Sequence, residues 1–526
     1  MRRPFKGLSA GAGPLPRYDA VVIGAGVGGL TCANLLAEGG LRVLLVEQHY
    51  TAGGYCSTFR RQGYTFDAAT HFYPLLGNPE TITGRLLGRL GVATGWVKMD
   101  PVDRFHFPDG STFTVPADFD EYRRKIDAEF PHEREALDAF FRSVRQAYLL
   151  GLLCYFRWRD LSLLETYREL TVRDALDLLF KDRKLKLLLT ADSPHWGSPP
   201  GRTSYVFDSM LRLSYFLGNY YPRGGSQAFA DELAQRFVER GGHVLLHTEV
   251  TAVRVRNGAA TGVALRCLHG PARAEREVSA GLVVSNADLL HTLTDLIGPR
   301  HVAPEYLDGV RRMRGTYPCF LTYLGVRGVA EDVLRRAHGY YWDGWDADEL
   351  GAGALKFKLF VPTLYEPAMA PPGCHTVIVQ KAVEVAYANV SDWPAHKARL
   401  EGFVLDNLEA VVPGLLAKAE VRLSATAATS QRFTRNDGGA MLGWEMSPGQ
   451  VGAGRPDVVG PLKNLFFVGH WTQPGGGITP VLVSAMRVAE LALRGADRAE
   501  SGLDMWGRLG QRAVPETAAA PVLAGV

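Results

Sequence analysis

The stretch from Tyr18 to Phe59 constrains the fold of this chain more than any other part of the sequence. It begins with an apolar run, Ala20 to Ile23, which is typical of a buried parallel strand. A glycine-rich turn and a helical pattern follow, and a second apolar run, Val43 to Val46, ends on Glu47. Strand, glycine turn, helix and strand in this order predict an α/β fold whose first unit binds a dinucleotide.

Four glycines of the turn are expected to form the binding site. Gly24 permits the tight passage from strand to helix, Gly26 lets a pyrophosphate approach the backbone, and Gly29 lets helix and strand pack closely. Gly28 lies at the start of the helix, where free N–H groups and a partial positive charge favour an anion. The spacing G-x-G-x-x-G would mean little alone among 58 glycines, but here it stands between a strand and a helix.

The residues that follow the second strand distinguish between cofactors. A carboxylate at Glu47 can accept both hydroxyls of an adenosine ribose, and it would repel the 2′-phosphate of NADP. Gly53 and Gly54 then form a second glycine turn, and the chain returns into the segment GYTFDAATHF. An NAD domain would pass directly into its next crossover helix, whereas a flavoprotein can use a second turn to hold the ribityl-phosphate arm. The sequence therefore predicts FAD.

Length, charge and cysteine content limit the other possibilities. With 526 residues the chain is too long for one simple core, so two closely joined domains are expected. A net charge of +3 gives no reason to expect a nucleic-acid partner. The six cysteines are scattered, with no C-x-x-C pair and no histidine cluster at metal-ligand spacing. We therefore expect no metal site and a reducing, cytoplasmic compartment.

The chain has no segment that approaches the roughly 20 apolar residues of a membrane-spanning helix, so we expect at most peripheral contact with a membrane. The N-terminus is positively charged but lacks a continuous apolar core, which argues against a signal peptide. Residues 1–17 and 510–526 are expected to be disordered tails.

The βα pattern of the first unit resumes far along the chain, which indicates a nucleotide-binding domain that is discontinuous in sequence. We assign residues 18–79, 224–300 and 435–497 to this FAD-binding domain. Residues 80–223 and 301–434 are assigned to a substrate-binding cap domain, which is helical in its first part and rich in strands in its second. The chain is thus expected to combine an α/β domain with an α+β domain.

Two features of the intervening segments bear on chemistry. The segment from Phe140 to Trp158 carries leucines and aromatic residues on all sides, so it either lines a lipophilic tunnel, touches a membrane surface, or is a buried cap helix. The segment from Gly63 to Gly77 would pass beneath the isoalloxazine ring of a flavoprotein. His71 within it is the candidate contact to flavin or substrate and the candidate general base. A histidine hydrogen-bonded among aromatic residues is the structural alternative.

Several motifs occur in an order that resembles one flavoprotein family. They are VVIGAGVGGL with VEQH, YPRGGSQAFADELA with HTEVTAV, VVSNAD, LFVPTLYEPAMAPPG, RNDGGAMLGWE, and LFFVGHWTQPGGGITPVLVSAM. Together, over roughly residues 18 to 497, they resemble the phytoene desaturases, carotenoid isomerases and retinol saturases, which are related more distantly to amine oxidases. The resemblance implies a Rossmann-like, glutathione-reductase-like FAD-binding domain.

The same resemblance implies further cofactor contacts. Val250 would meet the adenine through its backbone. Gly469, His470, Gly477 and Ile478 would cradle the ribityl chain and the pyrimidine edge, near the start of a helix whose N-terminus points at the flavin O2. The family usually has Gly-Asp where this chain has Gly469 and His470. A histidine can also donate or accept the hydrogen bond that the aspartate makes to the ribityl chain.

The function implied is FAD-dependent redox chemistry at the carbon–carbon bonds of a long apolar polyene such as a carotenoid, by desaturation, saturation or cis–trans isomerisation. One alternative is a phytoene-dehydrogenase-like tailoring enzyme that forms rings on a polyketide polyene macrolactam. Another is a non-catalytic escort protein that shields prenyl groups. The intact set Gly24, Gly26, Gly29 and Glu47 argues against the escort protein, because such a binder needs no complete nucleotide site.

Overall fold

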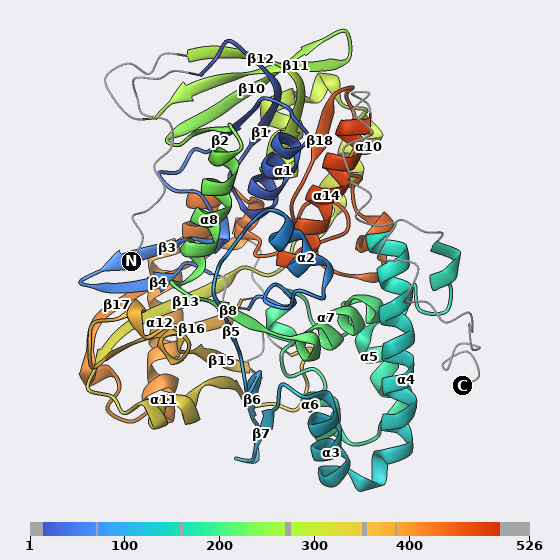
Figure 1. Cartoon of the computed structure of the whole chain (residues 1–526). Coiled ribbons are helices and arrows are strands. Elements are labelled where there is room, and N and C mark those ends of the chain that lie inside the picture. Colours follow the sequence, from blue (N-terminus) through green and yellow to red (C-terminus); the bar gives the residue numbers. More distant parts are fainter. Residues whose placement is uncertain are drawn as a thin grey trace.

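Two large sheets and a group of helices make up the structure, which is a computed structural model describing residues 14–69, 72–157, 161–268, 275–349, 355–383 and 387–494. The first sheet occupies the upper half of Figure 1, the second the lower left, and the cap helices the lower right. His71, together with most of both predicted tails, lies outside the described residues, although Arg17 already begins the first strand.

The first sheet has the strand order β10-β11-β12-β1-β2-β9, with β18 paired to β12. The pairs around β1 are parallel, and β10, β11 and the start of β12 form an antiparallel arm. Its members are β1 (Arg17–Ile23), β2 (Val43–Val46), β9 (His243–Leu245), β10 (Thr248–Arg256), β11 (Ala259–Cys267), β12 (Glu275–Ser285) and β18 (Leu465–Phe467). Segments far apart in sequence thus meet in one sheet, although the domain boundaries given above stay a prediction.

Three helices pack against the parallel strands: α1 (Val27–Glu38), α8 (Ser226–Glu239) and α14 (Ile478–Arg494). Helix α1 is buried from Val27 to Ala37, because sheet and helices cover it on all sides. This explains why its sequence is apolar throughout rather than amphipathic. A Cβ atom at Gly29 would lie 2.1 Å from the Gly24 carbonyl oxygen, so only glycine permits this approach of helix to strand.

The second sheet has the order β17-β13-β16-β15-β14-β6-β7 and is antiparallel except between β14 and β6. Strands β13 to β17 come from residues 301–434, the part of the predicted cap domain that was expected to be rich in strands. The strands of this sheet are β6 (Asp103–His106), β7 (Thr112–Val115), β13 (Cys319–Arg327), β14 (Gly339–Trp342), β15 (Leu355–Phe360), β16 (Cys374–Ala382) and β17 (Ala419–Ala425). There are also two small sheets of two strands each. One pairs β3 (Thr58–Arg61) with β4 (Tyr64–Asp67), and the other pairs β5 (Trp96–Lys98) with β8 (Tyr220–Pro222).

The helices of the cap pack around an apolar core that they share with strands of the second sheet. The helical part of the cap consists of α3 (Phe119–Glu129), α4 (Arg134–Gly151), α5 (Val172–Leu179), α6 (Arg183–Leu188) and α7 (Tyr205–Leu217), and α4 continues into a π-helical turn, Leu152–Phe156. The other helices are α2 (Ile82–Arg89), α9 (Leu289–His291), α10 (Pro304–Arg312), α11 (Glu331–Ala337), α12 (Trp393–Val411) and α13 (Ala427–Thr434). Within the described residues no helix is long and apolar enough to cross a membrane.

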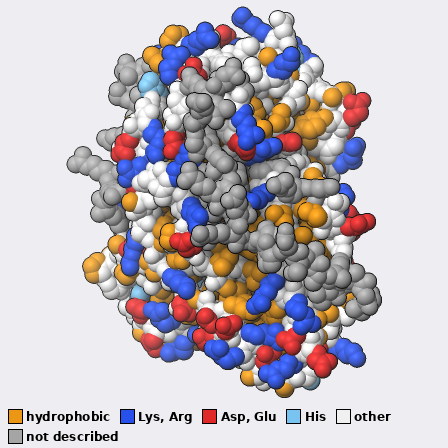
Figure 2. Space-filling model, turned by 45° about the vertical axis from the view of Figure 1, so that its right-hand side comes forward, with side chains coloured by type: hydrophobic (Ala, Val, Ile, Leu, Met, Phe, Trp, Pro, Cys, Tyr) orange, Lys and Arg blue, Asp and Glu red, His pale blue; other side chains and the backbone are white. Residues whose placement is uncertain are grey.

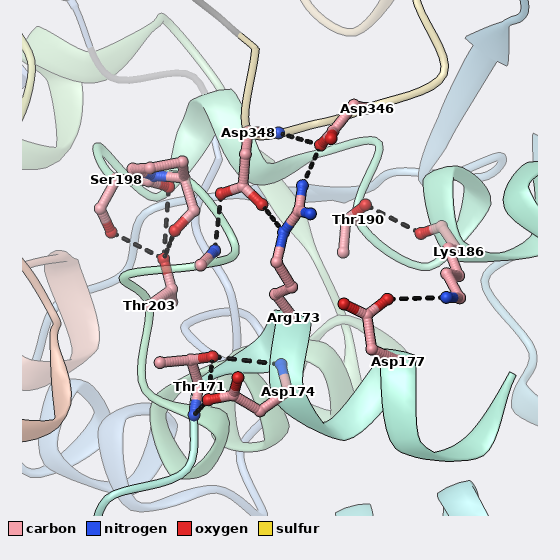
Figure 3. Close-up of polar contacts among 12 residues, drawn as sticks. Thr171, Arg173, Asp174, Asp177, Lys186, Thr190, Ser198, Thr203, Asp346 and Asp348 are labelled. Atoms are coloured by element: carbon pink, nitrogen blue, oxygen red, sulfur yellow. Dashed lines mark hydrogen bonds and ion pairs between the residues drawn. The ribbon is translucent and has the colours of Figure 1, made fainter.

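Helix α5 of the cap has a side-chain cap at its start and is joined by ion pairs to the loop after β14. Thr171 caps α5 by accepting a hydrogen bond from the backbone N–H of Asp174 (3.2 Å), and the Asp174 carboxylate accepts one from the Thr171 N–H (3.1 Å). In the first turn of the same helix, Arg173 pairs with Asp346 and Asp348 in the loop after β14 (Figure 3). Since the loop continues a strand of the second sheet, this arginine fixes α5 relative to that sheet.

A buried ion pair lies inside the second sheet. The Lys358 ammonium on β15 lies 2.9 Å from Asp103 Oδ2 on β6, and both side chains are at most 5% exposed. The Tyr340 hydroxyl lies 3.2 Å from the same ammonium, whose nitrogen is also 3.6 Å from the Phe72 ring centroid. The pair therefore connects segments 255 residues apart in sequence.

Removing one member of this pair should destabilise the protein more than removing both. Lys358→Met leaves a buried carboxylate without its cation, which costs about 3–5 kcal/mol. Replacing Asp103 by Leu in the same chain should recover much of that loss, which urea unfolding of the single and double variants measures. Strictly additive losses would contradict a direct interaction between the two charges.

Candidate active site

One cavity of about 710 Å³ brings together nearly all the cofactor residues predicted from the sequence. Its wall contains residues of the α1 N-terminus, the second glycine turn, the turn before α14, the second sheet, and cap helices α4 and α7. The predicted residues that line it are Gly24, Gly26, Gly28, Glu47, Gly53, Gly54, Val250, Gly469, His470, Gly477 and Ile478. Gly29 does not line it and instead packs behind the turn, as its predicted role requires.

The glycines of this wall surround the side chain of Asn286, which follows β12. A Cβ at Gly26 would lie 2.8 Å from Asn286 Nδ2, and one at Gly28 would lie 2.8 Å from Asn286 Oδ1. Asn286 Nδ2 donates to the Gly24 carbonyl oxygen at 3.4 Å. The wall is therefore made of backbone and one amide, and no side chain caps the N-terminus of α1. Backbone N–H groups at a helix start are a suitable site for a phosphate.

Asn286 was not among the residues predicted to bind the cofactor. Its motif VVSNAD was noted only as part of the family resemblance, although the residue stands at the carboxyl end of a parallel strand. Ligands of open α/β sheets bind outside these strand ends. That position was the signal that could have identified Asn286.

The Glu47 carboxylate is held in place by backbone N–H groups. Oε2 accepts a hydrogen bond from Ala25 N (2.7 Å) and Oε1 accepts one from His49 N (2.8 Å). Burial raises the pKa of Glu47, and these hydrogen bonds partly offset that rise. Each carboxylate oxygen has a further lone pair, so Glu47 can still accept hydrogen bonds from the hydroxyls of a ribose.

Both remaining glycine turns use backbone conformations that favour glycine. In the second turn, Gly53 has φ of 119° and Gly54 has φ of 58°, and Gly53 N donates to the Ala25 carbonyl oxygen at 2.8 Å. Before α14, Gly469 has φ of 105° and Gly477 has φ of 99°. These turns bring backbone, rather than side chains, to the cavity wall.

His470 occupies the position where the family usually has aspartate, and it is electrically neutral at physiological pH. Burial, together with the nearby Arg455 guanidinium, lowers its pKa to about 3. Its Nε2 lies 3.4 Å from Asn436 Oδ1. The neutral imidazole therefore brings no negative charge to this wall, in contrast to the carboxylate that it replaces.

The other part of the cavity has apolar walls. Tyr148 of α4 lines it together with Leu152 and Tyr155 of the following π-helical turn, while Phe140 packs in the cap core instead. The lipophilic segment identified from the sequence thus both lines the cavity and fills the core. Further apolar lining comes from α7, β13, β17 and the segment after α13, with Phe207, Met210, Leu211, Leu321, Leu423 and Met441.

Several polar side chains in this apolar part carried no signal in the sequence. His195 lines the cavity, and its ring centroid lies 5.0 Å from that of Phe72. Burial, with the Lys358 charge nearby, lowers the pKa of His195 to about 3. Gln380 of β16 also lines the cavity. His71 lies outside the described residues, while its neighbours Ala69 and Phe72 line the cavity, so its predicted role stays a prediction.

Comparisons with known proteins identify the family. A model of the family described as flavin containing amine oxidoreductase matches residues 27–493. The chain belongs to this family. It is 28% identical over 501 residues to a neurosporene-forming phytoene desaturase of Cereibacter sphaeroides, covering 90% of this chain and 94% of that one. It is 26% identical over 501 residues to prolycopene isomerase 2 of an Oncidium hybrid cultivar, covering 90% and 83% of the two chains.

Solved structures agree on the fold. Putrescine oxidase bound to putrescine superposes with a TM-score of 0.64 at 14% identity, covering 92% of this chain and all of the other. An oxidoreductase from Methanosarcina mazei gives a TM-score of 0.63 at 18% identity, with 90% and 99% covered. The protein is an FAD-dependent oxidoreductase of the phytoene desaturase and carotenoid isomerase type, with a Rossmann-like domain and a substrate domain.

The residues around the cavity fit FAD. The backbone walls at Gly26 and Gly28 leave room for a pyrophosphate next to the α1 N-terminus, and Glu47 presents acceptors to a ribose. The cavity then continues from these groups to Gly477 and Ile478, where α14 begins, and on to the apolar walls. The phosphates of FAD would therefore contact backbone at the start of α1, and its flavin end would contact backbone at the start of α14.

Replacing Gly28 by Ala should greatly reduce FAD binding. The added methyl group would lie 2.8 Å from Asn286 Oδ1 and 3.3 Å from the Gly469 Cα, so it would fill the space beside the helix N-terminus. We expect the flavin content of the purified protein to fall about tenfold or more, because a loss of ~1.4 kcal/mol of binding free energy already weakens binding tenfold. The ratio of visible flavin absorbance to protein absorbance measures this content.

Gly88→Ala on α2 is the matched control, because no atom lies within 4 Å of a Cβ placed there. This variant should keep its flavin. Equal flavin content in both variants would show that the α1 N-terminus does not contact the cofactor.

Proposed function

We propose that this flavin-containing amine oxidoreductase acts on the carbon–carbon bonds of a long, apolar polyene, as a desaturase, a saturase or a cis–trans isomerase. The observation that carries the proposal is one cavity of about 710 Å³, which joins the cofactor residues to an apolar wall. The residues of α4 and α7 that line it carry no charge. A polyene has no charge to pair and gains stability from burial against such a wall.

The named relatives support this substrate class. One is a phytoene desaturase and the other a prolycopene isomerase, and each spans nine-tenths of this chain. The two names describe different reactions, a desaturation and an isomerisation, and both of these act on a polyene. The cavity of this chain suits any of these reactions, because all of them require an apolar site next to the cofactor.

FAD, when bound, supplies a reversible acceptor for a hydride or for electrons. The chain itself disfavours water on the cap side, where Tyr148, Leu152, Phe207 and Leu211 line the cavity with apolar surface. Exclusion of water protects reactive intermediates and strengthens the electrostatic effect of the helix N-termini. His71 is proposed as the base that removes a proton when the reaction is a desaturation.

His195 is a weaker candidate for that base. With a pKa of about 3 its imidazole is neutral near pH 7 and has little affinity for a proton. Its position within the cavity suits contact with the substrate rather than proton removal.

The two alternative functions make different demands on the same cavity. A tailoring enzyme for polyketide polyene macrolactams would use the same cofactor residues with a substrate that carries an amide. An escort protein would need only the apolar walls. The glycine walls around Asn286 and the fixed Glu47 carboxylate are superfluous in an escort protein, so they favour an enzyme.

An anaerobic single-turnover experiment tests the proposal. Flavin-loaded enzyme, once oxidised and once chemically reduced, is mixed with a panel of carotenoid and polyketide polyenes, and product mass is read. We expect turnover of at least one polyene, with loss of two hydrogens for a desaturase, gain of two for a saturase, or unchanged mass with altered retention for isomerisation or redox-neutral cyclisation. Conversion of no polyene by enzyme in either redox state would contradict the proposal.

We also propose that the enzyme takes its substrate from a membrane surface. Leu149 on α4 and Leu163 after the π-helical turn are 47% and 49% exposed, close in sequence to the cavity-lining Tyr148 and Leu152. Arg145 on the same helix is exposed and can meet anionic headgroups. Figure 2 shows hydrophobic side chains gathered in the lower middle of one face, bordered below by charged side chains.

Replacing Leu149 and Leu163 together by Ser should weaken binding to anionic liposomes about tenfold, because two exposed apolar side chains that would enter the interface are lost. Co-sedimentation measures the binding. The control is Val238→Ser on α8, which removes an exposed apolar residue (39%) away from the cap. Equal binding by all three proteins would rule out this surface as the contact.

A further inference from the structure

The side chain of Gln380 stands out among the groups of the apolar cavity. It lies on β16, paired with Leu321 of β13 on one side and with Lys358 of β15 on the other. It is only 6% exposed, yet it lines both the main cavity and a small adjoining cavity of about 20 Å³. A buried carboxamide in such a position requires hydrogen-bond partners.

The protein provides poor partners for this carboxamide. Nε2 donates to Cys319 Sγ at 3.0 Å and to Met441 Sδ at 3.6 Å, and the Cys319 thiol itself donates to Met441 Sδ at 3.4 Å. Thiol and thioether sulfurs are weak acceptors. Within the described residues the Gln380 carbonyl oxygen accepts no hydrogen bond, so the amide keeps most of its hydrogen-bonding capacity for another molecule.

The small cavity beside Gln380 suits a neutral polar group. Its volume, about 20 Å³, is enough for one hydroxyl-sized group and too small for a larger one. Its lining includes Tyr55, Ser430 and Met441, and no residue of the lining carries a formal charge. An ionised carboxylate or ammonium would be unpaired here and is therefore excluded by the cost of its desolvation.

The position of Gln380 assigns it to the substrate rather than to the cofactor. None of the predicted FAD-binding residues lines the small cavity. Around Gln380 the main cavity is formed by apolar residues of the second sheet and of the segment after α13, including Leu321, Leu423 and Met441. These are the walls that the proposed function gives to the polyene.

We infer that Gln380 hydrogen-bonds a neutral group of the substrate that both donates and accepts, namely a hydroxyl carried by the polyene. This inference rests on the proposed function and narrows its substrate class, because a bare hydrocarbon would leave the buried amide unpaired. A site built to hydrogen-bond a polar group discriminates strongly against the analogue that lacks it.

The test compares polyenes of equal length that differ in one group: a hydrocarbon, an alcohol, its methyl ether and a secondary amide. Each is titrated into flavin-loaded enzyme, and the perturbation of the flavin spectrum gives the dissociation constant. Wild-type enzyme should bind the alcohol at least tenfold more tightly than the hydrocarbon, the ether and the secondary amide, whose polar group is too large for the small cavity. Gln380→Met, which preserves volume and removes the amide, should abolish this preference.

Gln380→Met should bind the hydrocarbon at least as tightly as wild type does, because no buried amide is left unpaired, and its flavin content should be unchanged. The control, Gln235→Met, changes an exposed residue of α8 whose Nε2 donates a hydrogen bond to Glu239 on the same helix, and it should behave as wild type. Equal affinity of wild type for all four compounds, or equal weakening of all four in Gln380→Met, would overturn the inference while leaving the proposed function intact. Binding of none of them to flavin-loaded wild type would overturn the proposed function, and the inference with it.

Discussion

The close packing of α1 on β1 is the constraint on which the rest of the structure depends. With Gly29 against the Gly24 carbonyl oxygen, the helix starts directly above the end of the strand, and its N-terminal N–H groups face the cavity. Asn286 reaches the same point from the end of β12 because β12 pairs in parallel with β1. A side chain at Gly26 or Gly28 would approach Asn286 and fill the space that a phosphate needs.

The second constraint is the continuity of the cavity. Strands β13 and β16 of the second sheet, and helices α4 and α7 of the cap, extend the wall from the cofactor residues into apolar surroundings. The cap must therefore keep a fixed position relative to both sheets. Arg173 with its two aspartates, and the buried pair of Lys358 with Asp103, provide directional contacts between segments far apart in sequence.

Local patterns explain why much of the fold could be predicted from the sequence. Strand β1, its glycine turn and helix α1 form within one stretch, so spacing alone indicates them. The same holds for the apolar strands β13, β15 and β16, whose runs are long enough to be distinct. The prediction that Gly477 and Ile478 contact the cofactor came from a family resemblance. In the structure both residues line the cavity that Gly24 and Gly26 also line.

The residues that escaped prediction reach the site through long-range packing. Asn286 lies 262 residues from the Gly24 carbonyl group that it contacts, and Gln380 lies 61 residues from Cys319. Neither residue belongs to a spacing pattern, because a strand carries each one to a site formed by other segments. His195, in a short turn of the cap, faces the cavity for the same reason. Such positions follow from the arrangement of strands and helices, which the sequence pattern leaves open.

The most direct test of this account is an experimental structure of flavin-loaded enzyme with a bound polyene. The account predicts the FAD pyrophosphate beside Gly26 and Gly28 at the N-terminus of α1, and the polyene along β13 and β16, reaching the flavin within the same cavity. A polyene bound outside this cavity, or a flavin whose phosphates lie away from α1, would contradict the central claim that one cavity holds cofactor and substrate end to end.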